Sequence, residues 1–392
     1  MKKIYMEKFK FIDLFAGIGG FHVAMEKLGG ECVFASEINK FSIATYQENY
    51  GMDAGFDICQ VAEEEIPAHD VLCGGFPCQA FSKAGKQAGF VDTRGTLFFE
   101  IERILKFHRP KYIVLENVRN LVSHDSGNTW RIISVKLKEL GYLITESPII
   151  MSPHQLGIPQ LRERVYILGI LKEHTLLDAL TIDIPTPVKH KTKAKKMLDG
   201  KVGYEYRISD YEEMVLDAWD EFMQGIDKKV IGFPVWSDEF RATYDYSKLP
   251  LWKQGFIAKN RELYQRNKSF LDGWFKKHDN LEAFTPTHTK FEWQANSSIK
   301  SLWEGIIQFR PSGIRVKRPT EFPALVAMVH IPIIGWEKRR LTPREAANLQ
   351  SFPQNFKINS NPQQAYKQFG NSVNVEVVKF LADQLFRLGK IT

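Results

Sequence analysis

The sequence predicts an α/β protein in which a doubly wound sheet carries a smaller inserted domain. From Phe11 to Ile170, short apolar runs alternate with stretches of helical periodicity, as in a parallel sheet with crossover helices. From Ile184 to Arg340 this alternation is lost, and most of the tryptophans lie there. The 392 residues are enough for two or three domains, and 44% hydrophobic residues are enough for a core.

The alternating region predicts strands and helices in a definite order. Phe11–Phe15 is predicted to be a strand, Ala16–Gly20 a glycine turn, and Phe21–Leu28 a helix that ends at Gly29. Further strands are expected at residues 31–36, 70–73, 111–115, 142–150 and 165–170, and further helices near residues 96–107 and 127–139.

Two more helices are predicted after the irregular segment. Thr342–Glu345 has the pattern of a capping box with proline at the first helical position, so a helix is expected to continue to Gln350. Residues 373–388 form an apolar helix, which needs the N-terminal sheet to pack on. We therefore expect residues 1–183 and 362–392 to form one discontinuous domain and residues 184–361 to form the inserted domain.

The net charge of the chain is concentrated in the irregular segment. The 53 Lys and Arg residues against 46 Asp and Glu residues give a net charge of +7. Between Ile184 and Arg340 there are 27 basic and 20 acidic residues, so this segment holds the whole excess. An anionic partner is therefore expected to bind there. Tyr204–Glu221 is acidic on balance, and we expect it to be an accessory subdomain that does not face this partner.

The sequence does not indicate secretion, membrane insertion or a metal site. The N-terminal residues include lysines but no apolar stretch of signal-peptide length, and the longest apolar tract, Phe322–Trp336, contains two prolines and a histidine. The four cysteines form no CxxC pair and have no neighbouring histidine pair. We therefore expect a cytoplasmic protein that has neither a metal ion nor disulfides.

The glycine turn and the following strand suggest a nucleoside ligand. Gly17 and Gly19 lie between a strand and a helix, and Glu37 at the tip of the next strand can accept hydrogen bonds from both hydroxyls of a ribose. A dinucleotide site would have glycine or alanine where this chain has His22. A ligand without phosphates is therefore favoured over NAD. S-adenosylmethionine fits, with Asp57 placed to meet the adenine amino group.

A thiol, a carboxyl group and two guanidinium groups are expected to converge at one edge of the sheet. Cys78 leaves a buried strand at its carboxyl end, where open α/β sheets bind ligands, and it is a potential thiolate. Glu116 ends the next strand and brings a carboxyl group to the same edge. Arg162 and Arg164 are two residues apart, so both side chains can point into the crevice.

Together these segments resemble the C5-cytosine DNA methyltransferase family, in the order usual for that family. The resemblance covers nearly all of residues 9–183 and 340–392. It implies a Rossmann-like, S-adenosylmethionine-dependent methyltransferase domain with an inserted target recognition domain. The segments that carry it are Asp13–Gly20, Glu37, Asp57-Ile58, Gly75-Phe76-Pro77-Cys78-Gln79, Glu116-Asn117-Val118, Gln160–Arg164, Arg340–Glu345 and Gly370-Asn371-Ser372-Val373.

The resemblance also implies a chemical role for each group at the edge. Cys78 would attack C6 of cytosine, which makes C5 nucleophilic enough to take the methyl group of S-adenosylmethionine. Glu116 would hold the N3 and N4 edge, and Arg164, assisted by Arg162, would contact O2. The products would be 5-methylcytosine and S-adenosylhomocysteine. The residues implied around the cofactor are Phe15, stacked on adenine, and Gly17, Gly19, Glu37, Asp57, Ile58, Pro77, Asn371 and Val373.

Duplex DNA is the partner that the resemblance implies, with the target base flipped out of the helix. The loop Gln79–Gly95 suits closure over DNA because its glycines can act as hinges and its basic residues can meet phosphates. We expect a monomer from a restriction–modification system with a cognate endonuclease, or an orphan or phage methylase. The expected DNA contacts are Ser82, Lys83, Lys86 and Arg94 in the loop, and Arg310, Arg315, Lys317 and Arg318 in the inserted domain.

Three other functions fit the sequence less well. RNA methyltransferases with two cysteines usually carry the nucleophile where Glu116 stands, and the tRNA-methylating relatives have small recognition regions. A catalytically silent DNA-binding module would be expected to lose Cys78 or Glu116. A Rossmann oxidoreductase disagrees with His22, and the sequence offers it no hydride-transfer site. Which DNA sequence is the target stays open.

Overall fold

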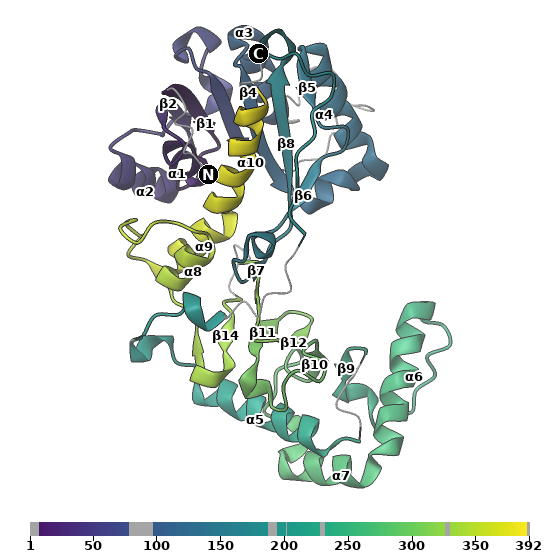
Figure 1. Cartoon of the computed structure of the whole chain (residues 1–392). Helices are drawn as coiled ribbons and strands as arrows, with labels where there is room; N and C mark the ends of the chain where they lie inside the picture. Colours follow the sequence, from purple (N-terminus) through teal and green to yellow (C-terminus); the bar gives the residue numbers. More distant parts are fainter. Residues whose placement is uncertain are drawn as a thin grey trace. The chain divides into compact units, whose positions relative to one another are not determined.

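The computed structural model describes residues 8–77, 97–186, 194–200, 202–227, 232–325 and 330–389 (Figure 1). The chain divides into unit 1, Met1–Thr192 with Ala346–Thr392, and unit 2, Lys193–Glu345. The expected domain limits at 183/184 and 361/362 differ from this division mainly on the C-terminal side. Residues 346–361 pack within unit 1, because the Gln350 side chain donates to the Phe369 carbonyl at 3.0 Å and the rings of Phe352 and Phe369 are 5.4 Å apart.

Unit 1 contains a seven-stranded sheet of order β2-β1-β3-β4-β8-β5, in which β6 also pairs with β8. β1 to β4 are parallel, as expected for a doubly wound sheet, but β8 is antiparallel to β4. The strands of this unit are β1 (Phe9–Leu14), β2 (Gly30–Ser36), β3 (Val71–Gly75), β4 (Tyr112–Val118), β5 (Tyr142–Ile144), β6 (Ile149–Met151), β7 (Gln160–Leu161) and β8 (Arg164–Leu171).

The single strand expected at residues 142–150 is wrong, because the structure has two strands there. β5 ends at Ile144, and the Thr145 hydroxyl then donates to the carbonyl of Ser147 at 2.7 Å, which closes a local turn. Pro148 follows and has no backbone N–H to donate to a neighbouring strand. The chain returns to the sheet as β6, which pairs with the beginning of β8.

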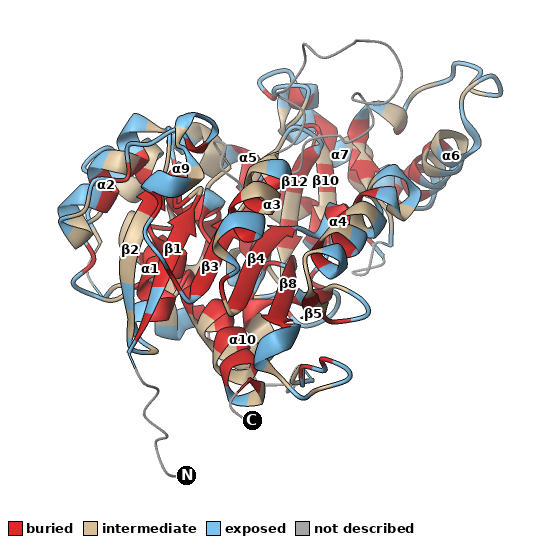
Figure 2. Ribbon diagram, turned by 90° about the horizontal axis from the view of Figure 1, so that it is seen from above, coloured by how far each residue is buried: buried red, intermediate tan, exposed pale blue. Residues whose placement is uncertain are grey.

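Helices cover both faces of this sheet, and the strands between them are buried except β2, which is mostly intermediate (Figure 2). On one face Phe386 of α10 packs against Phe9 of β1, with the ring centroids 5.2 Å apart. On the other face Phe98 of α3 and Ile133 of α4 join the core formed by Leu72 and other strand residues. The helices are α1 (Gly20–Glu26), α2 (Lys40–Tyr50), α3 (Leu97–His108), α4 (Asn128–Glu139), α8 (Pro343–Leu349), α9 (Pro362–Asn371) and α10 (Val375–Leu388), of which α8 crosses the boundary between the units.

Unit 2 contains a six-stranded sheet of order β15-β14-β11-β12-β10-β9. Its strands are β9 (Val235–Trp236), β10 (Lys290–Trp293), β11 (Ile306–Arg310), β12 (Gly313–Lys317), β14 (Ile333–Ile334) and β15 (Arg339–Arg340); the short strand β13 (Phe322–Pro323) lies outside this sheet. The helices are α5 (Asp210–Gly225), α6 (Leu251–Arg266) and α7 (Lys268–Lys277).

The acidic stretch Tyr204–Glu221 is not an accessory subdomain, because its helix α5 belongs to the core of unit 2. The ring of Trp219 stacks on Phe291 of β10 at 4.8 Å with an interplanar angle of 9°. Val215 and Phe222 on the same side of the helix are fully buried. The apolar stripe of α5 packs on the sheet while its acidic residues occupy the other side, and net charge alone did not reveal this stripe.

Within the described ranges no helix is both long and apolar enough to cross a bilayer.

Cys73 is fully buried in β3, and burial raises the pKa of its thiol well above the ordinary value. Cys32 and Cys59 are also free thiols. Across the described residues, His, Cys, Asp and Glu side chains form no group of three suited to a metal ion.

Candidate active site

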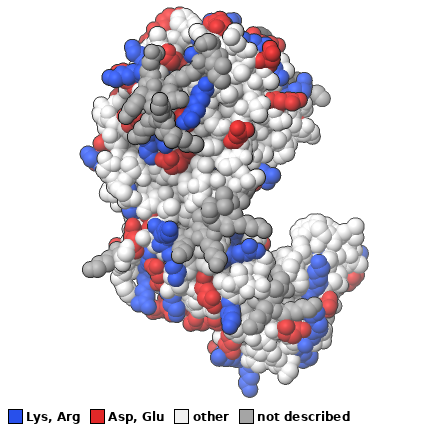
Figure 3. Space-filling view, viewed as in Figure 1, with Lys and Arg blue, Asp and Glu red and all other residues white. Residues whose placement is uncertain are grey.

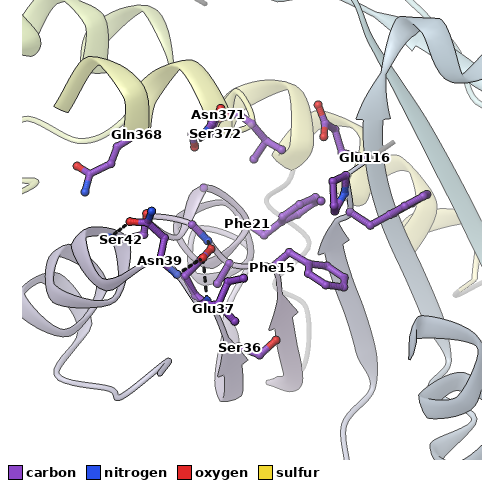
Figure 4. A pocket seen from close by; sticks show the side chains of 18 of the residues that line it. Phe15, Phe21, Ser36, Glu37, Asn39, Ser42, Glu116, Gln368, Asn371 and Ser372 are labelled. Atoms are coloured by element: carbon purple, nitrogen blue, oxygen red, sulfur yellow. Dashed lines mark hydrogen bonds between the residues drawn. The ribbon is translucent and has the colours of Figure 1, made fainter. Parts of the chain in front are cut away.

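A pocket in unit 1 lies at the carboxyl ends of β1 to β4, which is where doubly wound sheets bind ligands (Figure 4). It brings together residues from the β1–α1 turn, the tip of β2, the ends of β3 and β4, and the segment before α10. The residues predicted from the sequence that line this pocket are Phe15, Gly17, Glu37, Asp57, Ile58, Pro77, Asn371 and Val373 from the cofactor set, and Glu116, Arg162 and Arg164 from the catalytic set.

The backbone of the β1–α1 turn has an unusual conformation. Phe15 has φ 57°, in the left-handed region that non-glycine residues rarely adopt. Such a conformation costs on the order of 1–3 kcal/mol and is concentrated at functional sites. Figure 4 shows the rings of Phe15 and Phe21 projecting toward the side of the pocket where Glu116 lies. The strained backbone thus presents an aromatic face to the pocket.

Glu37 holds the turn and the tip of β2 together. Its Oε2 accepts from the backbone N–H of Gly17 at 2.8 Å, and its Oε1 accepts from the N–H groups of Ile38 and Asn39 at 2.9 and 2.8 Å. A carboxylate has about four acceptor positions, so three protein donors leave about one, on Oε2. Glu37 is therefore fixed in the pocket and can take one hydrogen bond more easily than two.

Gly19, which was predicted to contact the cofactor, is not part of the pocket lining. It has φ 80°, and a Cβ atom there would lie 2.4 Å from the ring of Tyr50 in α2. The Tyr50 hydroxyl donates to the carbonyls of Ile18 and Gly19 at 3.0 and 3.1 Å. Gly19 is needed because Tyr50 packs directly beneath the turn.

His22 belongs to the same support. Its ring stacks on Tyr50 at 3.8 Å, and its Nδ1 lies 2.6 Å from the Tyr46 hydroxyl. Burial lowers the pKa of His22, although Glu26 opposes this. The residue that argued against a dinucleotide site thus packs under the turn, in the space between α1 and α2.

Gly20 allows α1 to lie close to the segment before α10. A Cβ atom on Gly20 would be 2.6 Å from a methyl carbon of Val373 and 2.7 Å from the Ser372 hydroxyl. The Ser372 carbonyl in turn accepts from Nη2 of Arg162 at 2.8 Å. Val373, a predicted cofactor residue, is therefore packed against the glycine turn, and its neighbour Ser372 is bonded to Arg162.

Glu116 lies at the end of β4 between two arginines. It is only 8% exposed, and burial raises the pKa of its carboxyl group, while Arg164 and Arg162 oppose this rise. Arg164 Nε is 3.1 Å from Glu116 Oε1. Burial, together with the Arg164 charge, lowers the pKa of Arg162 to about 10. The site can therefore hold a proton on Glu116 beside permanent positive charge.

Cys78 and the loop after it lie outside the described residues, and so do the expected DNA contacts Ser82, Lys83, Lys86 and Arg94. The first described stretch of the chain ends at Pro77, which lines the pocket. The side-chain amide of Asn117 donates to the Phe76 carbonyl at 2.8 Å. This bond ties the end of β4 to the segment that leads into Cys78.

The other expected DNA contacts lie in unit 2. Arg310 ends β11, Arg315 and Lys317 lie on β12, and Arg318 follows β12 and is exposed. Figure 3 shows patches of Lys and Arg on the face of unit 2 that this view presents, with Asp and Glu among them. The segment Ile184–Arg340, which holds the excess positive charge of the chain, lies almost wholly in this unit.

Several residues of the pocket lining were missed from the sequence: Phe21, Ser36, Asn39, Ser42, Phe56, Asn117, Gln368 and Ser372. Asn39 had a detectable signal, since its side chain caps α2 by accepting from the N–H groups of Phe41 and Ser42 at 3.1 Å. Gln368 had none, because it reaches the pocket through its bond to the Phe41 carbonyl at 2.9 Å, far away in the sequence.

Comparison with known proteins places the chain in one family. The family described as C-5 cytosine-specific DNA methylase matches residues 9–387. Type II methyltransferase M1.ScrFI of Lactococcus lactis subsp. cremoris is 36% identical, over 97% of this chain and 79% of the relative. Type II methyltransferase M.HhaI of Haemophilus parahaemolyticus is 32% identical, over 95% and 93% of the two chains.

Solved structures share the fold. The Dnmt2 methyltransferase of S. pombe superposes with a TM-score of 0.57 at 20% identity, over 97% of this chain and 98% of the other. The Entamoeba histolytica methyltransferase EhMeth has a TM-score of 0.57 at 18% identity, over 97% of this chain and 99% of the other. These similarities confirm the predicted Rossmann-like methyltransferase fold, and the family match spans almost the whole sequence. The chain therefore belongs to the C-5 cytosine-specific DNA methylase family and is a DNA (cytosine-5-)-methyltransferase.

Proposed function

We propose that this enzyme methylates C5 of one cytosine in a short, specific duplex sequence, with S-adenosylmethionine as the methyl donor. The observation that carries the proposal is the pocket in which Phe15 and Glu37 lie on one side and Glu116 with Arg162 and Arg164 on the other. The Type II names of the relatives favour a restriction–modification system with a cognate endonuclease over an orphan or phage methylase. We further propose that the enzyme is cytoplasmic and acts as a monomer.

The pocket fits an adenosyl ligand that has no phosphates. Phe15 offers a ring for stacking on adenine, and Glu37 keeps an acceptor position on Oε2 for a ribose hydroxyl. Asp57 accepts from the N–H of Cys59 at 3.1 Å through Oδ1 and is exposed, so its carboxylate can also accept from the adenine amino group. S-adenosylmethionine would supply an electrophilic methyl group beside Glu116.

The groups around Glu116 fit a cytosine whose C6 is under attack. Cys78 Sγ would form a bond to C6 while N3 takes a proton from Glu116, which leaves an electron-rich C5 that bonds to the methyl group. Arg164 would donate to O2 and stabilise the charge on the ring. Loss of the C5 proton to water, departure of the Cys78 thiolate and return of the N3 proton to Glu116 would restore the aromatic ring as neutral 5-methylcytosine. The raised pKa of Glu116 favours its role as the proton donor.

Base flipping is part of this proposal. In a duplex, C6 of cytosine is stacked and cannot reach a nucleophile at the carboxyl edge of a sheet, so the target base must leave the helix. The loop 79–95 remains the proposed element that closes over the DNA. The proposed cofactor and catalytic residues lie in unit 1, and unit 2 is proposed to select the sequence.

Duplex DNA that carries 5-fluorocytosine tests the mechanism. Fluorine cannot leave as a proton does, so the enzyme should be trapped as a covalent adduct on Cys78 when the cofactor is present. Peptide mass analysis would locate the adduct, and bisulfite sequencing of unsubstituted DNA would locate the methylated cytosine. Cys78→Ala should give neither product. Methylation by Cys78→Ala, or a trapped adduct at another residue, would contradict the proposal.

A further inference from the structure

One face of the unit 2 sheet carries polar side chains on its three central strands. Strand alternation places Phe291, Ile314 and Val316 in the core, so the residues between them point to the other face. These residues are Lys290 and Glu292 of β10, Gln308 and Arg310 of β11, and Arg315 and Lys317 of β12; we call them the polar face. Four of the six are basic, so the polar face has a net positive charge.

Glu292 and Arg315 lie opposite each other in the parallel pair β10–β12, and Gln308 is opposite Arg315 on the other side. Oε2 of Glu292 accepts from Arg315 Nε at 2.8 Å and lies 2.7 Å from Arg315 Nη2. The side chains of Arg315 and Glu292 are 22% and 30% exposed. The ion pair is thus closely formed by two nitrogens and is still partly exposed to a ligand.

The contact uses only one edge of the guanidinium group. Nε and the near hydrogen of Nη2 face Glu292, so Nη1 and the outer hydrogen of Nη2 remain as a second fork at the end of the side chain. This end-on fork is the group that pairs with O6 and N7 of guanine in the major groove. A carboxylate that holds the other edge fixes the direction of the fork before DNA arrives, which reduces the entropy lost on binding.

We propose that Arg315 reads a guanine of the target sequence and that Glu292 is the positioning residue that aims it. The inference rests on the proposed function, because it assumes that unit 2 selects duplex DNA. A base edge requires a fixed donor direction, whereas phosphates accept donors from many directions. Among the basic residues of the polar face, Arg315 is bound by two nitrogens to one carboxylate oxygen, and Arg310 Nη1 reaches the same oxygen only at 3.5 Å.

The neighbouring cations suit a different task. Lys317 has no carboxylate partner among the described residues, and burial together with Arg315 and Arg310 lowers the pKa of its ammonium group. A phosphate would relieve this repulsion, so Lys317 is suited to hold the DNA backbone. Arg315 would then distinguish between DNA sequences, and Lys317 would increase the affinity for DNA of any sequence.

The test is a methylation assay on a pool of duplexes with randomised sequence, read by bisulfite sequencing. The wild-type enzyme defines the target. Arg315→Gln should lose discrimination at one G·C pair of that target by roughly tenfold or more, with the other positions unchanged. Glu292→Gln keeps one acceptor oxygen and should lose less discrimination at the same pair than Glu292→Ala does. If Glu292 only stabilised the fold, the two variants would not differ in this way at one base pair alone.

Glu262→Gln is the matched control, because Glu262 pairs with Arg266 at 3.6 Å on α6 and both lie off the polar face. This variant should leave the discrimination at every base pair of the target unchanged. Equal loss at every position would show that Arg315 binds phosphate, and an unchanged profile or relaxation at an A·T pair would also overturn the inference. If the wild-type enzyme methylates no cytosine at C5, the proposed function itself fails, which is a different result.

Discussion

At the scale of single residues, the protonation of Glu116 is the property that links the structure to the chemistry. Burial raises the pKa of this carboxyl group and two arginines lower it, with the net shift upward. A carboxylic acid that keeps its proton at higher pH can donate to N3 of a bound cytosine. In the proposed mechanism the arginines would remain charged and would stabilise the electron density that builds up on the ring. A glutamate at the protein surface would be ionised before the reaction began.

Replacing Glu116 with glutamine tests this role. Glu116→Gln keeps the size of the side chain but cannot deliver a proton, so the methyl transfer rate should fall by about a hundredfold or more. In the wild-type enzyme the protonated form is active, so the rate should fall as the pH rises through the raised pKa of Glu116. This alkaline limb should be absent from the variant. Single-turnover rates with saturating DNA and cofactor measure both effects, and an unchanged rate with the same pH profile would disprove the role.

His69 affects stability rather than catalysis. It is 8% exposed, its Nδ1 lies 2.8 Å from the Pro67 carbonyl, and burial lowers its pKa to about 4. The unfolded chain has a histidine pKa near 6.5 and so binds the proton first as the pH falls. The neutral ring therefore costs nothing above pH ~6.5, and stability is lost between pH ~6.5 and ~4, by up to roughly 3 kcal/mol.

His69→Gln should make the free energy of unfolding less sensitive to pH over that range. Urea unfolding at pH ~7 and pH ~5 would measure the difference. His174→Gln is the control, since His174 has an exposed side chain beside Glu173 at 3.7 Å. If His69→Gln loses as much stability on acidification as the wild-type protein, another group causes the acid sensitivity.

The sequence predicted pocket residues best where strand position alone brings them together. Glu37 follows β2 and Glu116 lies near the end of β4, and the parallel strands of one sheet bring their carboxyl ends to the same edge. Gly19 shows the limit of this reasoning. A glycine in a turn signals an unusual φ angle, but it does not tell whether a ligand or a tyrosine ring occupies the adjacent space.

At the scale of elements, helix α2 supports the pocket from below. Its Tyr50 bonds to two carbonyls of the β1–α1 turn and stacks on His22. The glycines of the turn have no side chains that could anchor it. The turn is therefore held from outside, by Glu37 at Gly17 and by Tyr50 at Ile18 and Gly19, although α2 contributes only its first residues to the pocket. Rigid support of this kind lowers the entropy cost of binding a cofactor.

Tyr50→Phe should loosen the turn without removing the ring from His22. The loss of hydrogen bonds to two carbonyls should weaken S-adenosylmethionine binding several-fold, at about 1 kcal/mol. Calorimetric titration would measure this affinity. Tyr142→Phe removes a comparable bond, 2.7 Å to the Pro110 carbonyl, on a strand outside the pocket and should leave cofactor affinity unchanged. Equal affinity for Tyr50→Phe and the wild-type enzyme would refute the support role.

Helix α2 is an element that the sequence missed because its signal is not periodic. The apolar residues of α2 do not gather on one face, so only its cap at Asn39 and the left-handed Gly51 mark it. α9 was also missed, although it has a buried apolar face and its start is marked by Asn361 as the cap and Pro362 at the first position. The antiparallel direction of β8 could not be predicted, because a buried strand has the same apolar pattern in both directions.

At the scale of the whole molecule, the two units have different chemical compositions. The discontinuous unit 1 contributes the pocket, whereas the segment Ile184–Arg340, nearly all of it in unit 2, holds the +7 charge. Many basic residues of unit 2 are neutralised locally, as Arg339 is by the fully buried Glu345 at 2.7 Å. Lys317 and the exposed Arg318 have no ion-pair partner among the residues that the structure describes, so they are the ones that can meet phosphates.

Neutralising Lys317 and Arg318 together should weaken DNA binding and leave cofactor binding unchanged. Each lost phosphate contact removes about one counterion from the salt dependence of the affinity, so the slope against salt concentration should decrease by one to two. The loss should be similar for target and non-target duplexes. Lys106→Gln with Lys138→Gln makes the same charge change on exposed helix positions of unit 1 and serves as the control. If the control pair reduced the slope equally, net charge rather than the surface of unit 2 would determine the affinity.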